Sequence, residues 1–235
     1  MHSNFQKPDL NAPFAIGTKN YKILKDSLLE ENKEAAPLTL LELGTGASTF
    51  HLANDLDKVK IFSLESDPRF FSKYNKEIAE SGLTEKVTIR HCPVTMQFIH
   101  FGLYESYHKR CAANTYFDAI IIDGPTERIY PFGREAALYL FFDLLNCGAL
   151  IFLDDYHRPS ARRAVSNWLT TYGKNALSVE IENDSFIVLR KSNSTYSARP
   201  RPPHHKNLHT PWAQIYQKTI KIFAAKNYPE KTHVT

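Results

Sequence analysis

Short apolar runs alternate with longer amphipathic segments along most of this chain. The apolar runs have the length of β-strands and occupy residues 38–43, 59–65, 86–91, 117–123 and 149–155. Segments with helical spacing of apolar side chains, or with helix-ending residues, occupy residues 18–34, 48–56, 68–82, 133–148 and 160–173. Strands that alternate with helices pair in parallel through right-handed crossovers, so the pattern predicts a doubly wound α/β fold.

The last two apolar runs lie close together and differ from the others. Residues 176–183 and 185–191 flank a short polar turn, which predicts an antiparallel hairpin. The earlier runs at 117–123 and 149–155 are almost wholly apolar, as expected for strands that are covered on both faces. The sequence therefore predicts a Rossmann-like, mostly parallel sheet that ends in an antiparallel strand.

The composition changes at Ser192. The residues that follow are rich in Pro, Ser, His and Arg, which is typical of a linker. Residues 190–235 hold nine Lys/Arg and one Glu, a net charge of +8, whereas residues 1–189 carry −4. We expect an N-terminal helical segment that forms a lid (1–37), a central domain (38–191) and a basic tail (192–235) with a linker and a C-terminal helix.

The tail carries one predicted amphipathic helix. Its apolar side chains are Trp212, Ile215, Tyr216 and Phe223. Such a helix packs back on its own domain, packs on a second subunit in a homodimer, or makes weak contact with a membrane surface. The mildly acidic body argues against a nucleic-acid partner. No run of about 18 apolar residues occurs, so no transmembrane segment is expected.

The cysteines bear on the compartment. Cys92, Cys111 and Cys147 are odd in number and widely spaced, which matches neither a disulfide framework nor a zinc motif. We expect small buried thiols in a reducing compartment. The N-terminus also lacks the basic-then-apolar layout of a signal peptide. These features predict a cytoplasmic protein.

The stretch "LLELGTGAST", residues 40–49, turns from the first predicted strand into a helix. Gly44 and Gly46 allow a ligand to approach the backbone closely. A dinucleotide site would use a third glycine to hold a pyrophosphate, and this loop has none. An acid at Glu42 suits a cationic ligand better than a phosphate. The loop therefore favours a sulfonium cofactor.

A second acid, Glu65, ends the next predicted strand. An acid at this position can accept hydrogen bonds from the hydroxyl groups of a ribose. The nearby Asp67 precedes Pro68, and we expect it to cap the following helix.

Four stretches of the sequence resemble those of the class I S-adenosylmethionine-dependent methyltransferases: "LELGTGAST", "FSLESD", "FDAIIIDG" and "GALIFLDD". The resemblance covers about residues 38–190. The resemblance implies a seven-stranded sheet with an antiparallel last strand. It places the cofactor contacts at Glu42, Gly44, Thr45, Gly46, Ser48, Thr49, Glu65, Ser66, Pro93 and Asp123. Many members have an adenine-facing Asp after the third strand; here the stretch is "RHCPVTMQ", and Cys92 to Thr95 would supply backbone and apolar groups.

Three aspartates end the fourth and fifth predicted strands. Asp123 and the pair Asp154 and Asp155 would converge in one crevice, where carboxylates repel one another unless a positive charge is present. Mg²⁺ suits such oxygen ligands. The ending "LDDYHR" is similar to metal-dependent sugar and catechol-type O-methyltransferases, which implies that all three are metal ligands. Alternatively, Asp123 positions the methionine moiety or a loop, and the other two form turn bonds and caps.

Further polar and aromatic residues flank the same region. His157 is a candidate general base, although a loop histidine is commonly just solvated. Arg128, Arg134 and Arg158 would hold an anionic group of the substrate or neutralise the acids. Tyr130 and Tyr156 would stack on a sugar or aromatic ring, or simply lie at loop edges.

Together these residues predict an S-adenosylmethionine-dependent methyltransferase that acts on an oxygen of a small molecule or glycan. Whether Mg²⁺ assists the reaction is left open by the sequence. Asp123, Asp154 and His157 are the predicted catalytic residues. Two alternatives remain: an NAD(P)-dependent oxidoreductase on a Rossmann sheet, and a non-catalytic binding partner that keeps the methyltransferase fold.

Overall fold

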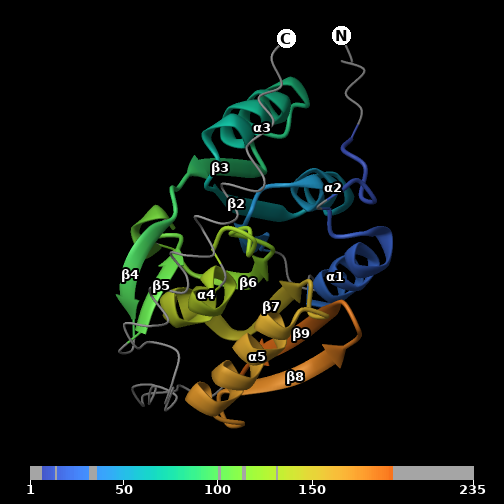
Figure 1. Ribbon diagram of the computed structural model, residues 1–235. Coiled ribbons are helices and arrows are strands. Elements are labelled where there is room, and N and C mark those ends of the chain that lie inside the picture. Colours follow the sequence, from blue (N-terminus) through green and yellow to red (C-terminus); the bar gives the residue numbers. More distant parts are fainter. Residues whose placement is uncertain are drawn as a thin grey trace.

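The computed structural model of the chain describes residues 7–13, 15–31, 36–99, 102–112, 115–130 and 132–192. Helices and strands alternate along most of it (Figure 1). The helices are α1 (Thr18–Glu31), α2 (Ala47–Asp55), α3 (Pro68–Glu80), α4 (Gly133–Phe141) and α5 (Pro159–Tyr172). The strands are β1 (Leu38–Leu43), β2 (Val59–Glu65), β3 (Val87–His91), β4 (Thr95–Ile99), β5 (Gly102–Ser106), β6 (Phe117–Ile122), β7 (Leu145–Asp154), β8 (Leu177–Glu182) and β9 (Phe186–Lys191).

Seven strands form one sheet in the order β3-β2-β1-β6-β7-β9-β8. β1 pairs in parallel with β2 and β6, and β7 pairs in parallel with β6, whereas β9 runs antiparallel to both β7 and β8. This confirms the predicted doubly wound sheet with an antiparallel last strand. The strand order reverses at β1, and ligands of open α/β sheets bind beyond the carboxyl ends of the strands at such a point.

Helices cover both faces of this sheet (Figure 1). Side chains of α1, α2 and α3 pack with one set of strand residues, which includes Leu40 and Ile61. Side chains of α4 and α5 pack with the alternate set, which includes Leu41 and Ile120. The central strands are therefore apolar on both sides, which explains why they form continuous apolar runs in the sequence.

The N-terminal helix α1 belongs to the first of these layers. It buries Tyr21, Leu24 and Leu28, whose spacing places them on one face of the helix. The hydroxyl of Tyr21 donates to Asp55 of α2 at 2.9 Å, so this ring points toward α2. Asn20 reaches the carboxyl edge of the sheet instead, and the lid function of residues 1–37 stays a prediction.

The helix predicted over residues 133–148 is shorter in the structure. α4 ends at Phe141, and a 3₁₀ turn, Phe142–Leu144, leads directly into β7. The expectation that Gly148 ends the helix was therefore wrong. Gly148 has a φ of 82° and lies where the register between β6 and β7 is interrupted. Asn146, in the same bulge, donates to Asp118 of β6 at 2.7 Å, which anchors the irregular start of the strand.

A separate two-stranded sheet, formed by β4 and β5, follows β3 and was not predicted. It lies beside α4. Met96 and Phe98 lie on the outer face of β4 and are 60% and 70% exposed, although both are apolar. A half-buried strand is expected to bury its apolar positions and expose its polar ones, and β4 does not follow this pattern. Gln97 donates from its side chain to the backbone oxygens of Ser106 and Tyr107, at 3.1 and 2.9 Å, and so fixes the chain that leaves β5.

Cys92 and Cys111 form a disulfide, with their Cα atoms 6.0 Å apart. Cys147 is exposed. The expectation of three unpaired, buried thiols was therefore wrong. Cys92 follows β3 and Cys111 ends a 3₁₀ turn, so the bridge closes the segment that contains β4 and β5. The linear spacing gave no sign of the pair because the unpredicted hairpin brings the two residues together. The cytoplasmic location, argued partly from free thiols, stays a prediction.

Among the described helices, none is long and apolar enough to cross a bilayer. The predicted linker and C-terminal helix lie outside the described residues, which end at Ser192. Their contacts with the domain, a second subunit or a membrane surface stay predictions.

The glycine loop at residues 44–46 turns the chain from β1 into α2. Gly44 has a φ of 96°, and an added Cβ would lie 3.0 Å from the backbone nitrogen of Gly124. The loops after β1 and β6 therefore touch through their glycine backbones. At the start of α2, the N–H of Gly46 donates to the hydroxyl of Thr49 at 3.1 Å.

Glu42 holds this loop from inside the protein. Its side chain is fully buried and accepts hydrogen bonds from the hydroxyls of Ser48 at 2.7 Å, Thr49 at 2.5 Å and Ser63 at 2.8 Å. Burial raises the pKa of the Glu42 carboxyl to about 7, against the opposing effect of these three donors. The glycine loop is thus tied to a buried acid that titrates near neutral pH.

We expect the free energy of unfolding to depend on pH through Glu42. Because its pKa in the folded protein lies above the ordinary value of 4.5, the folded state binds the extra proton between about pH 4.5 and 7. Stability therefore falls as the pH rises through this window, by about 3 kcal/mol. Glu42→Gln should remove this loss, so that the variant exceeds the wild type at pH 8 but not at pH 5.

Urea unfolding from pH 5 to 8 measures this difference. Glu80→Gln, on the exposed surface of α3, is the matched control and should keep the pH slope of the wild type. Identical slopes for the wild type and Glu42→Gln would contradict the assignment.

The disulfide predicts a second effect on stability. The bridged residues are 19 positions apart, so reduction should lower the free energy of unfolding by about 3 kcal/mol through the greater freedom of the unfolded chain. Cys92→Ser should show the same loss and no response to reductant, whereas Cys147→Ser should behave as the wild type. Denaturant unfolding with and without dithiothreitol tests this, and an unreduced wild type with three titratable thiols would refute it.

Candidate active site

The carboxyl ends of β1, β2, β6 and β7 form one edge, where most of the predicted site residues gather. The glycine loop follows β1, Glu65 ends β2, Asp123 follows β6 and Asp154 ends β7. Because β6 pairs with both β1 and β7, Asp123 lies between the glycine loop and the other aspartates. The order of the strands therefore brings together residues that are far apart in the sequence.

Glu65 lies beside the glycine loop with only 6% of its surface exposed. Its Oε1 accepts the backbone N–H of Asp67 at 2.8 Å, and backbone groups of Thr45 and Ser66 also donate to the carboxylate. Burial raises the pKa of the carboxyl, and these donors oppose the rise. As predicted, Asp67 caps α3 by accepting the N–H of Arg69 at 2.8 Å. Glu65 is thus a fixed acceptor next to the loop.

The other predicted cofactor residues divide into two groups. Glu42, Ser48 and Thr49 are buried and bonded to one another, so they shape the loop from inside. Pro93 is exposed and follows Cys92, whose N–H donates to the backbone oxygen of Glu65 at 2.7 Å. Direct contact of any of these residues with a cofactor stays a prediction.

Tyr107 belongs to the same edge, although no sequence pattern singled it out. It follows β5 and is 1% exposed. Its hydroxyl forms a hydrogen bond with the side chain of Ser66. A Cβ added to Gly124 would lie 2.6 Å from this hydroxyl oxygen. Tyr107 therefore connects the Glu65 side of the glycine loop with the Asp123 side. A prediction of the β4–β5 hairpin would have identified Tyr107, because this residue directly follows β5.

The three aspartates converge as predicted. Asp123, Asp154 and Asp155 each offer one oxygen, and these oxygens lie within 4.8 Å of one another. Asp155 has a φ of 58°, in the left-handed region that aspartate adopts more readily than most residues. Burial raises the pKa of Asp123 and that of Asp154, the latter to about 7, and the charges of the neighbouring aspartates add to the effect.

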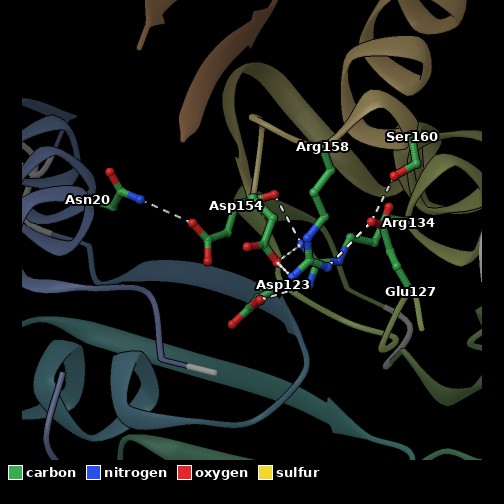
Figure 2. A network of polar contacts seen from close by, with 8 residues as sticks. Asn20, Asp123, Glu127, Arg134, Asp154, Arg158 and Ser160 are labelled. Atoms are coloured by element: carbon green, nitrogen blue, oxygen red, sulfur yellow. Dashed lines mark hydrogen bonds and ion pairs between the residues drawn. The ribbon is translucent and has the colours of Figure 1, made fainter. Parts of the chain in front are cut away.

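A guanidinium group lies among these carboxylates (Figure 2). Arg134, from α4, is 4% exposed, and its terminal nitrogens lie 3.1 Å from Asp123 and 3.0 Å from Asp155. It also donates to the backbone oxygen of Asp154 at 3.0 Å. Burial acts to lower the pKa of Arg134, but the aspartate charges outweigh it and raise that pKa. Of the two roles open to this arginine, the contacts favour neutralisation of the acids.

A second arginine extends the network outward (Figure 2). Arg158 pairs with Asp155 at 2.9 Å and with Glu127 at 3.5 Å. The hydroxyl of Ser160 donates to Glu127 at 2.8 Å. This outer group connects the start of α5 to the loop between β6 and α4.

Asn20 reaches the aspartates from the N-terminal helix (Figure 2). Its side-chain nitrogen donates to Asp154 at 3.2 Å, and its oxygen accepts the hydroxyl of Ser185 at 3.1 Å. α1 is thereby linked both to the end of β7 and to the turn between β8 and β9. Asp154 differs from the other two aspartates, because its carboxylate forms no ion pair among the described residues.

The carboxylate oxygens of the aspartates are ligands that suit a divalent ion, but two of the three side chains are already paired with an arginine. Mg²⁺ prefers oxygen ligands in near-octahedral geometry. Two of the predicted ligands, Asp123 and Asp155, already pair with the buried guanidinium of Arg134. Positive charges repel each other strongly where solvent is excluded. A metal at this place would require Arg134 to move, so the residues as arranged do not fit one.

The remaining predicted residues lie at the rim of the edge. His157 is exposed in the turn between β7 and α5. Tyr156 is half-buried, and its hydroxyl donates to Glu182 of β8 at 2.9 Å. The loop between β6 and α4 carries Arg128, which is exposed, and Tyr130, which is half-buried.

No protein-family model matches the sequence, and no curated protein matches it. Solved structures do match. The O-methyltransferase from Bacillus cereus, solved with S-adenosylhomocysteine, gives a TM-score of 0.57 at 16% identity and covers 77% of this chain and 84% of its own. TomG from Streptomyces achromogenes, an O-methyltransferase of tomaymycin synthesis solved with S-adenosylmethionine, gives 0.54 at 16% identity, with 77% and 83% covered.

A third solved structure widens the range of reactions. The precorrin-6y C5,15-methyltransferase from Geobacter metallireducens gives a TM-score of 0.54 at 14% identity and covers 77% of this chain and 91% of its own. At these identities the likeness establishes the fold and leaves the acceptor open. The described part of this chain therefore has the fold of the class I S-adenosylmethionine-dependent methyltransferases.

Proposed function

We propose that this chain is an S-adenosylmethionine-dependent methyltransferase that acts on a hydroxyl oxygen of a small molecule or glycan. The observation that carries the proposal is Glu65, a buried carboxylate held beside the glycine loop at the carboxyl end of β2. This is the place in the fold where an acid binds a ribose. The B. cereus and S. achromogenes enzymes were solved with S-adenosylhomocysteine and S-adenosylmethionine, which supports the same cofactor.

The cofactor would lie across the loops after β1 and β2. Gly44 and Gly46 present bare backbone to it, and Glu65 accepts the ribose hydroxyls. Ser66 and Pro93 flank the adenine side. The residues that hold this surface in shape are Glu42, Thr45, Ser48 and Thr49.

The reaction is an in-line displacement at the methyl carbon. S-adenosylmethionine, held by Gly44, Gly46 and Glu65, would supply an electrophilic methyl group to the acceptor oxygen and would leave as the neutral thioether. The proton of the acceptor hydroxyl passes to Asp154, which Asn20 orients and whose carboxylate pairs with no guanidinium within the part of the chain that the structure describes. Asp123, held by Arg134, positions the acceptor, and His157 at the rim is the alternative base.

The two other functions suggested by the sequence have less support. A nicotinamide-dependent oxidoreductase would need a pyrophosphate site, and this loop lacks the third glycine. A non-catalytic partner would have no need for three converging carboxylates. Calorimetric titration with NADH and with S-adenosylhomocysteine separates the three possibilities. Magnesium held by Asp123, Asp154 and Asp155 stays a prediction from the sequence, and the pairing of Arg134 argues against it.

Glu65→Gln should weaken the binding of S-adenosylhomocysteine by about 10- to 100-fold, because hydrogen bonds to a charged acceptor are lost. Isothermal titration calorimetry measures this change. Glu80→Gln, exposed on α3, is the matched control and should bind as the wild type does. A wild type that binds no S-adenosylhomocysteine would overturn the proposed function.

Asp154→Asn should lower kcat by about 100-fold or more while the affinity for S-adenosylhomocysteine changes by less than about threefold. The assay screens hydroxylated metabolites and glycans by mass spectrometry for the gain of one methylene mass. Asp26→Asn, on the outer surface of α1, is the control. A wild-type kcat in Asp154→Asn would remove the proton-accepting role from this residue.

A further inference from the structure

We propose that Arg134 takes the place of a divalent ion among Asp123, Asp154 and Asp155, as the positioning residue of a methyl transfer that needs no metal. The catalytic half of this inference rests on the proposed function. Its other half, that the cluster does not bind a divalent cation, concerns the aspartates alone and can be measured without a known acceptor.

The contacts of Arg134 are those expected of a built-in cation. One terminal nitrogen pairs with Asp123 at 3.1 Å, and the other pairs with Asp155 at 3.0 Å and donates to the backbone of Asp154 at 3.0 Å. A single planar guanidinium thus contacts all three residues that were predicted to be metal ligands. Planar, forked donors of this kind hold carboxylates in a defined geometry.

The backbone beside Arg134 is closely packed, so the guanidinium is not a mobile surface group. A Cβ added to Gly133 would lie 2.4 Å from the ring of Pro125 and 2.7 Å from the backbone oxygen of Glu105. The hydroxyl of Ser106 also donates to the backbone oxygen of Gly133 at 2.9 Å. The start of α4 is therefore fixed against both the β6 loop and the β4–β5 hairpin.

A divalent ion would have to enter against this charge. Arg134 is 4% exposed, so water screens it little, and a dication at the aspartates would lie within a few ångströms of it. Moving the guanidinium out would break its ion pairs with Asp123 and Asp155, which are partly buried on the aspartate side and fully buried on the arginine side. Breaking a buried pair leaves an uncompensated charge, which is strongly unfavourable. Both routes oppose occupancy of the cluster by a metal.

The three aspartates differ in how the arginines contact them. Arg134 and Arg158 hold Asp155, and Arg134 holds Asp123, so these two side chains are fixed by charge. Arg134 contacts Asp154 through its backbone oxygen, and the Asp154 carboxylate accepts hydrogen bonds from two neutral groups, the amide of Asn20 and the backbone N–H of Asp155. Its carboxylate is thus left to interact with the acceptor.

The first test measures Mn²⁺ binding to the full chain by electron paramagnetic resonance, with S-adenosylhomocysteine present. We expect the signal of free Mn²⁺ to persist at concentrations up to about 1 mM, the weak end of protein cation sites. Stoichiometric loss of this signal in the wild type, abolished by Asp154→Asn, would overturn the proposal. This measurement needs neither an acceptor nor an Arg134 variant.

The second test removes the built-in cation. Arg134→Met leaves the carboxylates of Asp123 and Asp154 without a paired guanidinium, while Arg158 still pairs with Asp155. We expect this variant to bind Mn²⁺ about tenfold or more tightly than the wild type. Arg134→Lys, which keeps the charge, should remain like the wild type. Arg163→Met is the matched control, because it removes an arginine that pairs with Glu135 away from the cluster. An equal gain of Mn²⁺ binding in Arg163→Met, or no gain in a folded Arg134→Met, would count against the proposal.

Once an acceptor is found, turnover in EDTA completes the test. We expect EDTA to leave kcat unchanged; loss of activity that Mg²⁺ restores would overturn the metal-independent step. Failure of the proposed function is a different result, because the chain would then bind no S-adenosylhomocysteine, whatever the Mn²⁺ measurements show.

Discussion

The ion pairs of Arg134 with Asp123 and Asp155 are the interaction on which the candidate site depends. They join α4 to the carboxyl ends of two neighbouring strands, at a point where three aspartates would otherwise repel one another. A fully buried ion pair adds little net stability, yet removing one partner costs about 3–5 kcal/mol, which is an upper bound here because the aspartate side chains are 22% exposed. Its value to the protein is therefore geometric, because it fixes the carboxylates of Asp123 and Asp155 and leaves that of Asp154 without an ion pair among the described residues.

The side of the edge where we propose that the cofactor binds is built from two other carboxylates, Glu42 and Glu65, and it contacts the aspartate side. Glu42 gathers three hydroxyls beneath the glycine loop, and Glu65 is fixed by backbone donors above it. Gly44 touches Gly124 across the edge, and the hydroxyl of Tyr107 lies against the same glycine. The contact between Gly44 and Gly124 therefore joins the glycine loop, proposed to bind the methyl donor, to the loop that carries Asp123. Through this contact the backbone would fix the position of the methyl group relative to the methyl acceptor.

Much of this architecture could be predicted from the sequence, because buried strands and glycine turns have local signatures. β1 and β2 begin and end where the apolar runs do. The β4–β5 hairpin could not be predicted, since its outer face exposes Met96 and Phe98, and with it the disulfide and Tyr107 were missed. The aspartates could be predicted to lie together because each one ends an apolar run that the sequence predicts to be a strand. The position of Arg134 among them depends on how α4 packs, which no spacing in the sequence encodes.

The most direct test of this account is a crystal structure of the chain with S-adenosylhomocysteine, grown in Mn²⁺ and measured at the manganese absorption edge. The account predicts a ribose hydrogen-bonded to Glu65, the guanidinium of Arg134 between Asp123 and Asp155, and no anomalous peak at the aspartates. A manganese peak there with Arg134 turned away, or a cofactor bound elsewhere than the glycine loop, would contradict it.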